Sequence, residues 1–176
     1  GLCSKTLVAV PNHLTGQFAS EALKLYPNAN ILVTTQRDFE KSNRKRFCAK
    51  IATGNYDIVV IGHSQFEKIP LSDARKAAFI RKQIDELEMQ LESMDNSDSR
   101  LTVKQLESKK KQLKTKLSNL LDAPKRDDVV TFEELGADSL MVDEAHNFKN
   151  LMTVTKMHNI AGISTTESQK ASDLFM

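Results

Sequence analysis

Short apolar runs, separated by stretches with helical periodicity, constrain the fold of this chain more than any other feature. Each run is rich in valine, isoleucine and leucine, and polar or turn-forming residues follow it. Runs that do not alternate apolar with polar residues are typical of parallel strands buried on both faces of a sheet. The four predicted strands comprise residues 5–10, 31–35, 56–61 and 138–142.

The segments between the first three strands have the spacing of amphipathic helices. Apolar residues recur at helical intervals after the first strand, at Leu14, Phe18, Ala22 and Leu25. We expect Asn12 to cap this helix, and Asp38 to cap a second helix that runs to about Thr53. A strand–helix–strand order predicts parallel pairing with a right-handed crossover. The sequence therefore predicts an α/β fold in which helices flank a parallel sheet.

A change in composition marks an insertion at residues 71–122. Two charged helices, at about residues 72–94 and 102–121, are joined by a short polar turn. The first carries a narrow apolar seam at Ile80, Ile84, Leu87 and Leu91. We therefore expect an antiparallel α-helical hairpin with a coiled-coil-like seam, inserted into a domain formed by residues 1–70 and 123–176.

One side of the second hairpin helix is basic. Its lysines cluster at Lys109, Lys110, Lys111 and Lys114. A charged helix face is most often simply solvated, but a basic one can also bind phosphates. The sequence leaves open whether the hairpin only pairs its own helices or also binds a protein partner or DNA.

Composition excludes several classes of protein. The net charge of +2 gives no global field that would attract nucleic acid or a membrane surface. Two cysteines, Cys3 and Cys48, are too few for a disulfide framework or a cysteine-based zinc site, and a reducing cytoplasm is the default compartment. No apolar run has the length of a membrane span. Because Gly1 and Met176 lie within unfinished patterns, we expect a fragment of a larger protein.

The fourth predicted strand ends in two adjacent carboxylates, Asp143 and Glu144, and His146 follows them. Open α/β sheets bind their ligands at the carboxyl ends of the strands. There a nucleoside triphosphatase needs one carboxylate to hold Mg²⁺, usually through water, and a second to polarise the attacking water.

Two other interpretations of these residues remain. Acidic residues after a strand can form a solvated loop or favour the N-terminus of a helix. A hydrolase that binds a metal through Asp143, Glu144 and His146 is the third possibility. It lacks a second cluster of ligands such as H-E-x-x-H.

Three sequence motifs, each at the end of a predicted strand, resemble those of the first RecA-like domain of superfamily two helicases and translocases of the DEAH-box and Swi/Snf-like kind. Residues 7–14, followed by Gln17-Phe18, resemble motif Ia, and residues 56–66 resemble motif Ib. Asp143-Glu144-Ala145-His146-Asn147-Phe148-Lys149-Asn150 resembles motif II, and its last residues are close to the Swi/Snf form. The chain is also similar to large helicase-like proteins of bacterial mobile elements and phages.

The resemblance implies a role for each matching position. Asp143 would hold Mg²⁺ on the phosphates of ATP, and Glu144 would activate the hydrolytic water. His146 would couple the nucleotide site to the parts that contact DNA. The loops at Pro11-Asn12-His13 and Gly62-His63-Ser64 would touch the nucleic-acid backbone without reading its sequence. For His13 and His63 the alternative is a loop histidine without a ligand. The parent protein would be a bacterial cytoplasmic ATPase that uses ATP and Mg²⁺.

The sequence departs from the family in lacking the loop that binds the phosphates of ATP. The loop G-x-x-x-x-G-K-[ST] is absent, and no glycine is followed by lysine. The resemblance places this loop upstream of Gly1. We therefore expect that the fragment alone neither holds ATP tightly nor hydrolyses it. The alternative is a non-catalytic interaction module that works through the hairpin.

Overall fold

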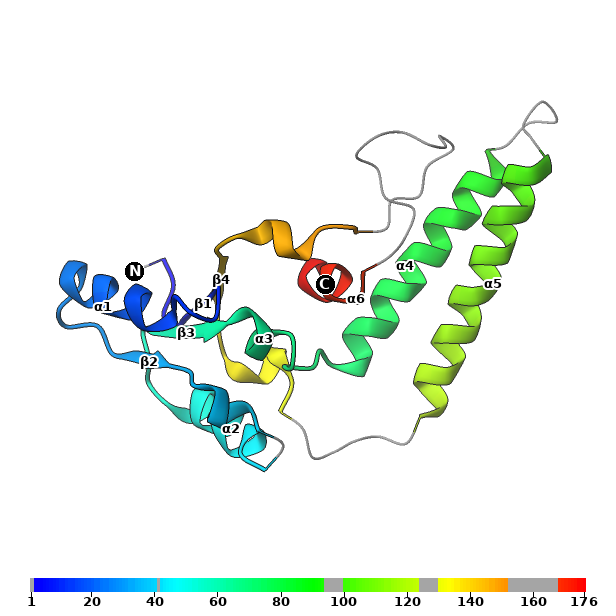
Figure 1. The fold of residues 1–176 in the computed structure, drawn as a ribbon. Helices are drawn as coiled ribbons and strands as arrows, with labels where there is room; N and C mark the ends of the chain where they lie inside the picture. Colours follow the sequence, from blue (N-terminus) through cyan, green and yellow to red (C-terminus); the bar gives the residue numbers. More distant parts are fainter. Residues whose placement is uncertain (1, 41, 94–99, 124–129, 152–167) are drawn as a thin grey trace. The chain divides into compact units, whose positions relative to one another are not determined.

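The computed structural model describes residues 2–40, 42–93, 100–123, 130–151 and 168–176 (Figure 1). The chain forms two compact units. The sheet unit combines residues 1–71 with 126–147, and the hairpin unit combines residues 72–125 with 148–176. The strands thus belong to one unit and the long helices to the other.

A four-stranded, fully parallel sheet forms the centre of the sheet unit, which confirms the predicted α/β class. Its strands are β1 (Thr6–Val10), β2 (Ile31–Val33), β3 (Ile58–Gly62) and β4 (Ser139–Val142). Their order is β2-β3-β1-β4, so β1 lies between β3 and β4. Val10 is opposite Gly62, and Ala9 is opposite Val142. The carboxyl ends of these three strands therefore lie at one edge of the sheet.

Helices cover both faces of β1, which explains why its apolar run does not alternate. Leu7 and Ala9 belong to the core formed with α2 (Arg44–Thr53), whereas Val8 and Val10 belong to the core formed with α1 (Thr15–Leu25). All five residues of β1 are buried. Full burial of one such valine or leucine side chain contributes about 1.5–3 kcal/mol.

β4 differs from the buried strand that its apolar residues predict. Leu140 and Met141 are 36% and 55% exposed. β4 pairs only with β1 and lies at the edge of the described sheet, so fewer neighbours cover it than cover β1. The position of β4 in the sheet, rather than its composition, sets its exposure.

Two helix caps differ from the predictions. Asn12 does not cap α1, which begins after Leu14 without a side-chain cap; its side chain instead accepts a hydrogen bond from Ser64 N. Asp38 does not begin α2, because it closes a 3₁₀ turn, η1 (Gln36–Phe39), together with Thr35. Thr35 N donates to Asp38 Oδ2 at 2.7 Å in a capping box. A polar side chain satisfied by this local turn is not available to cap α2.

A second 3₁₀ turn, η2 (Phe132–Leu135), leads into β4. Thr131 and Glu134 form a capping box, and Gly136 ends the turn with a left-handed φ of 68°. Glycine adopts this conformation without the steric cost of a Cβ atom. The turn brings Leu135, which is fully buried, into the core shared with α2.

Asp138 ties the beginning of β4 to the beginning of β1. Its carboxylate accepts hydrogen bonds from Ser4 Oγ at 2.6 Å, Ser4 N at 2.7 Å and Lys5 N at 2.9 Å. These donors lower the pKa of Asp138 to about 2, and the Ser4 hydroxyl has the largest effect. Lys5 Nζ donates to Ile51 O at 2.8 Å, near the C-terminus of α2. These bonds support the register that aligns the other ends of the two strands.

The hairpin unit contains the predicted antiparallel helices α4 (Asp73–Glu92) and α5 (Arg100–Asp122), which lie side by side (Figure 1). The buried residues of the core between these helices are Ile80, Ile84, Leu87, Leu106 and Leu113. Glu88 accepts from Lys110 at 2.9 Å and from Lys114 at 3.1 Å. These two bonds lower the pKa of Glu88. Two lysines of the basic side thus pair across the hairpin.

The last helix, α6 (Gln169–Phe175), groups with the hairpin, although the sequence analysis assigned residues 123–176 to the sheet domain. The Phe175 ring lies 5.8 Å from that of Phe79, and Arg75 Nε donates to Met176 O. The segment from Asn147 to Thr166, which shows no clear helical or strand period in the sequence, is described only to residue 151, and its remainder lies outside the described residues. Among the described helices, none combines the length and apolar character needed to cross a membrane.

Candidate functional site

Three strand ends of the sheet unit bring together the residues that the sequence analysis selected. Pro11, Asn12 and His13 follow β1; His63 and Ser64 begin α3 (His63–Phe66) directly after β3; and Asp143 and Glu144 follow β4. Because β1 separates β3 from β4, the ends of β3 and β4 are two strand spacings apart, or about 10 Å. A side chain that joins them must reach across the end of β1.

The turn after β4 has an unusual backbone conformation. Asp143 N continues the pairing with β1 through a hydrogen bond to Ala9 O at 2.8 Å. Glu144 then has a left-handed φ of 51°, and its N–H donates to Asp143 Oδ1 at 2.9 Å. A left-handed non-glycine residue costs about 1–3 kcal/mol, and such residues cluster at functional sites. The strained backbone is therefore that of Glu144, the residue whose carboxylate is predicted to activate water.

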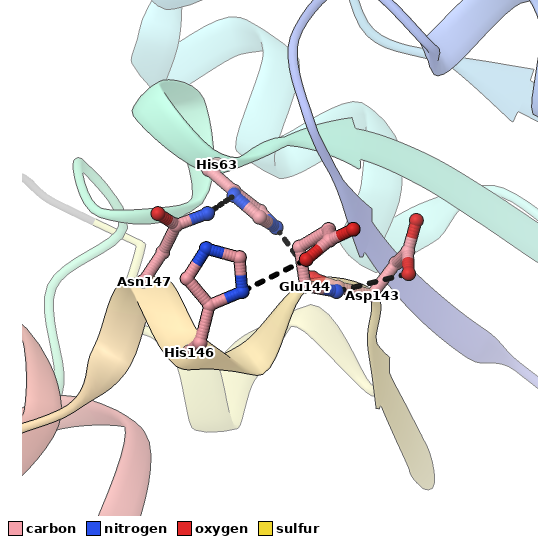
Figure 2. A network of polar contacts seen from close by, with 5 residues as sticks. All are labelled: His63, Asp143, Glu144, His146 and Asn147. Atoms are coloured by element: carbon pink, nitrogen blue, oxygen red, sulfur yellow. Dashed lines mark hydrogen bonds and ion pairs between the residues drawn. The ribbon is translucent and has the colours of Figure 1, made fainter.

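The side chains of Glu144 and His146 contact each other within the same turn, in which His146 lies on η3 (Ala145–Phe148). Glu144 Oε2 lies 2.8 Å from His146 Nδ1, and the two side chains are 52% and 68% exposed (Figure 2). Solvent screens a pair this exposed, so it contributes little to stability. Asp143 is exposed as well. The carboxylates can therefore be reached by a ligand from solvent.

His63 is buried and faces the turn after β4. It is 9% exposed, its Nε2 lies 2.9 Å from Asp143 O, and its Nδ1 lies 3.3 Å from Asn147 Nδ2 (Figure 2). The imidazole thus spans the end of β1. Of the residues predicted to contact nucleic acid, His63 points into the protein, whereas Asn12, His13 and Ser64 are exposed.

Asn12 joins the loop after β1 to the loop after β3. Its Oδ1 accepts from Ser64 N at 3.1 Å and from Ser64 Oγ at 3.2 Å. Gly62 allows this contact, because a Cβ atom there would lie 2.4 Å from Asn12 Oδ1 and 2.2 Å from Gln65 Oε1. Pro11 is partly buried beside it. The two loops present amide, imidazole and hydroxyl groups without a lysine or arginine.

The described part of the chain contains no set of side chains that would support a metal-dependent hydrolase. There, no three histidine, cysteine, aspartate or glutamate side chains are arranged to hold a metal ion. A single exposed carboxylate suits Mg²⁺, which usually keeps several waters and binds one or two carboxylates together with substrate phosphates. Asp143 matches this requirement, and its Oδ1 is already oriented by Glu144 N.

Sequence reasoning missed two parts of this network. Asn147 lies in the motif at residues 143–150, yet nothing in that pattern indicated a contact with a histidine 84 residues away. The signal for Asn12 was present, since asparagine side chains often accept from backbone N–H groups at helix starts, but Asn12 accepts from Ser64 N in α3 rather than from the next helix in the chain.

Comparison with known proteins gives one family. A family model described as "Probable helicase domain" matches residues 1–176. No curated protein and no solved structure matches the chain.

Proposed function

Because the chain belongs to this family of probable helicase domains along its whole length, we propose that its sheet unit carries the hydrolytic carboxylates of an ATP-dependent DNA helicase or translocase. The observation that carries the proposal is the position of Asp143 and Glu144 in a strained, exposed turn beside two polar loops. This is the edge at which open α/β sheets bind ligands. The DEAH-box and Swi/Snf-like subtype, and an origin in bacterial mobile elements, are part of the same proposal.

Asp143 and Glu144 have separate tasks in this mechanism. Mg²⁺, when bound with ATP, neutralises charge on the phosphates. Asp143 would hold the ion with a carboxylate that accepts a hydrogen bond from Glu144 N. Glu144 orients and deprotonates the attacking water, and its pairing with His146 sets where its carboxylate points. The exposure of the carboxylates lets ligands approach from solvent.

The loops after β1 and β3 bind the DNA backbone. Asn12, His13 and Ser64 are exposed at the same sheet edge and offer neutral hydrogen-bonding groups. Such groups contact phosphate and sugar without reading bases, which suits an enzyme that moves along any sequence. The loops lack fixed positive charge, so we propose weak binding with a modest dependence on salt.

The phosphates of ATP need residues that this sequence lacks. Without G-x-x-x-x-G-K-[ST], no glycine-rich backbone and no lysine hold the β- and γ-phosphates. We therefore propose that the chain by itself neither binds ATP tightly nor hydrolyses it. Turnover by the purified chain that Glu144→Gln abolishes would contradict this.

Fluorescence anisotropy with a labelled single-stranded oligonucleotide tests the DNA interface. Replacing exposed His13 by glutamate places a negative charge in the proposed interface, so the affinity should fall several-fold. The matched control is Asn28→Glu, an exposed substitution in the turn before β2. Equal affinities for both variants would exclude the loop after β1 from the interface.

A second candidate function is an interaction module that uses the hairpin, and the charge of α5 favours DNA as the partner. α5 contains seven basic and two acidic residues. A shallow groove on one side of α5 is lined by Ser108, Lys111, Gln112, Thr115, Lys116 and Asn119. Lysines among short polar side chains can follow a phosphate backbone closely.

A further inference from the structure

The contact between His63 and Asp143 joins two loops that are distant in sequence. Residues 63 and 143 are 80 positions apart, and they follow β3 and β4, which do not pair with each other. The imidazole contacts the main-chain oxygen of Asp143, so its effect falls on the backbone of the turn rather than on the carboxylate. That backbone leads directly into Glu144, whose φ is left-handed.

The contacts of His63 with Asp143 and Asn147 determine its tautomer. A carbonyl oxygen only accepts hydrogen bonds, so the Nε2 that lies 2.9 Å from Asp143 O must carry the proton. Nδ1 then accepts from Asn147 Nδ2 at 3.3 Å. The network therefore uses the neutral Nε2–H form, and both ring nitrogens hold residues on either side of Glu144 and His146.

Neighbouring bonds extend this network to the loop after β1. Ser64 directly follows His63, and it donates to Asn12 Oδ1 from both N and Oγ. A short series of contacts therefore runs from Asn12, through Ser64 and His63, to Asp143. By contrast, the contact between His146 and Glu144 lies within a single turn, and His146 is 68% exposed.

We propose that His63 is the positioning residue of the carboxylate turn and couples it to the two polar loops. Its Nε2–H holds the Asp143 carbonyl, and its Nδ1 holds Asn147, so that Glu144 keeps its left-handed conformation. The coupling role that the motif resemblance gives to His146 belongs to His63 instead. The positioning stands on the geometry alone, whereas the coupling of the turn to DNA rests on the proposed function.

Nuclear magnetic resonance of the ¹⁵N-labelled chain tests the positioning without any ligand. Long-range ¹H–¹⁵N spectra should show His63 as the Nε2–H tautomer. His63→Ala should shift or broaden the amide signals of Asp143, Glu144 and Asn147, because both hydrogen bonds are lost. His63→Gln should largely preserve the signals, because its side-chain amide can donate to Asp143 O.

Controls separate positioning from a loss of folding. The amides of Val8 and Val60, in the buried centre of the sheet, should keep their shifts in both variants. His13→Ala removes an exposed imidazole from a neighbouring loop and should leave the turn unchanged. The proposal fails if His63→Ala affects the turn no more than His13→Ala does, or if His63 is the Nδ1–H tautomer.

Adding a thymidine oligonucleotide tests the coupling through His63 separately from DNA binding itself. In the wild type, DNA should shift the Ser64 and Glu144 amides together; in His63→Ala it should shift only Ser64. A Glu144 response that persists in His63→Ala refutes the coupling. If DNA shifts neither amide in the wild type, the proposed function fails, and the ligand-free spectra still decide the positioning.

Discussion

Glu144 Oε2 and His146 Nδ1 lie 2.8 Å apart within a single turn, and the backbone of Glu144 is left-handed. The pair is exposed, so it gives little stability in return for the backbone strain. A strained residue that gains little from its own contacts is held by its surroundings.

Glu144→Gly should be more stable than Glu144→Ala by about 1 kcal/mol. Both variants remove the carboxylate, but only glycine adopts a φ of 51° without steric cost. Urea unfolding at neutral pH gives the difference. The control is Glu86 on α4, where glycine should instead be less stable than alanine by about 1 kcal/mol. Equal stability of the two Glu144 variants would mean that the turn is not strained.

Gly62→Ala should destabilise the sheet unit by about 1–3 kcal/mol, the usual cost of adding a methyl group to a packed site. The new Cβ atom would lie 2.4 Å from Asn12 Oδ1 and 2.2 Å from Gln65 Oε1. Gly16→Ala is the matched control: apart from its chain neighbours and the backbone of its own helix, α1, no described atom lies within 4 Å of its Cβ position, so this variant should be neutral or stabilising. Thermal unfolding compares the two. Similar melting temperatures would contradict the close contact at Gly62.

Asp138 should make stability depend on pH between about 4 and 2. Its pKa is lowered from 3.8 to about 2 in the folded chain, so its stabilising contribution is complete above the unfolded pKa. That contribution is lost as the pH falls through the folded pKa. Asp138→Asn should therefore be less stable than the wild type at neutral pH, and the difference should shrink towards pH 2.

Ser4→Ala provides a graded test of the same interaction. It removes the hydroxyl that lowers the Asp138 pKa most and leaves the two backbone donors. A carboxyl titration followed by magnetic resonance should give a pKa between about 2 and 3.8. An unchanged pKa would show that the backbone N–H groups alone account for the shift.

Lys111→Glu should weaken DNA binding if the hairpin binds the phosphate backbone. Lys111 lines the groove on α5, and each lost phosphate contact should lower the slope of log K against log salt by about 0.7 for a single strand. Lys82→Glu, an exposed substitution on α4, is the charge-matched control. Unchanged affinity for DNA, or an equal loss of affinity in both variants, would show that α5 does not bind DNA.

Sequence reasoning predicted best what depends on near neighbours in the chain. The four strands and the hairpin helices follow from local periodicity. Asn12 and Asp38 were assigned to the wrong helices, because a cap pattern shows that a side chain can cap but not which N–H it reaches. The exposure of Met141 depends on which strands flank β4.

The sequence by itself determined that polar residues follow buried parallel strands, since apolar runs form the strands and parallel pairing aligns their ends. It thus placed Asp143, Glu144 and both polar loops at one edge. Only the tertiary structure decided which side chains meet there. The order β2-β3-β1-β4 puts β1 between β3 and β4, so a buried His63 reaches Asp143 and Asn147 while Asn12 reaches Ser64. Contacts between residues 80 positions apart depend on strand order, which no local pattern encodes.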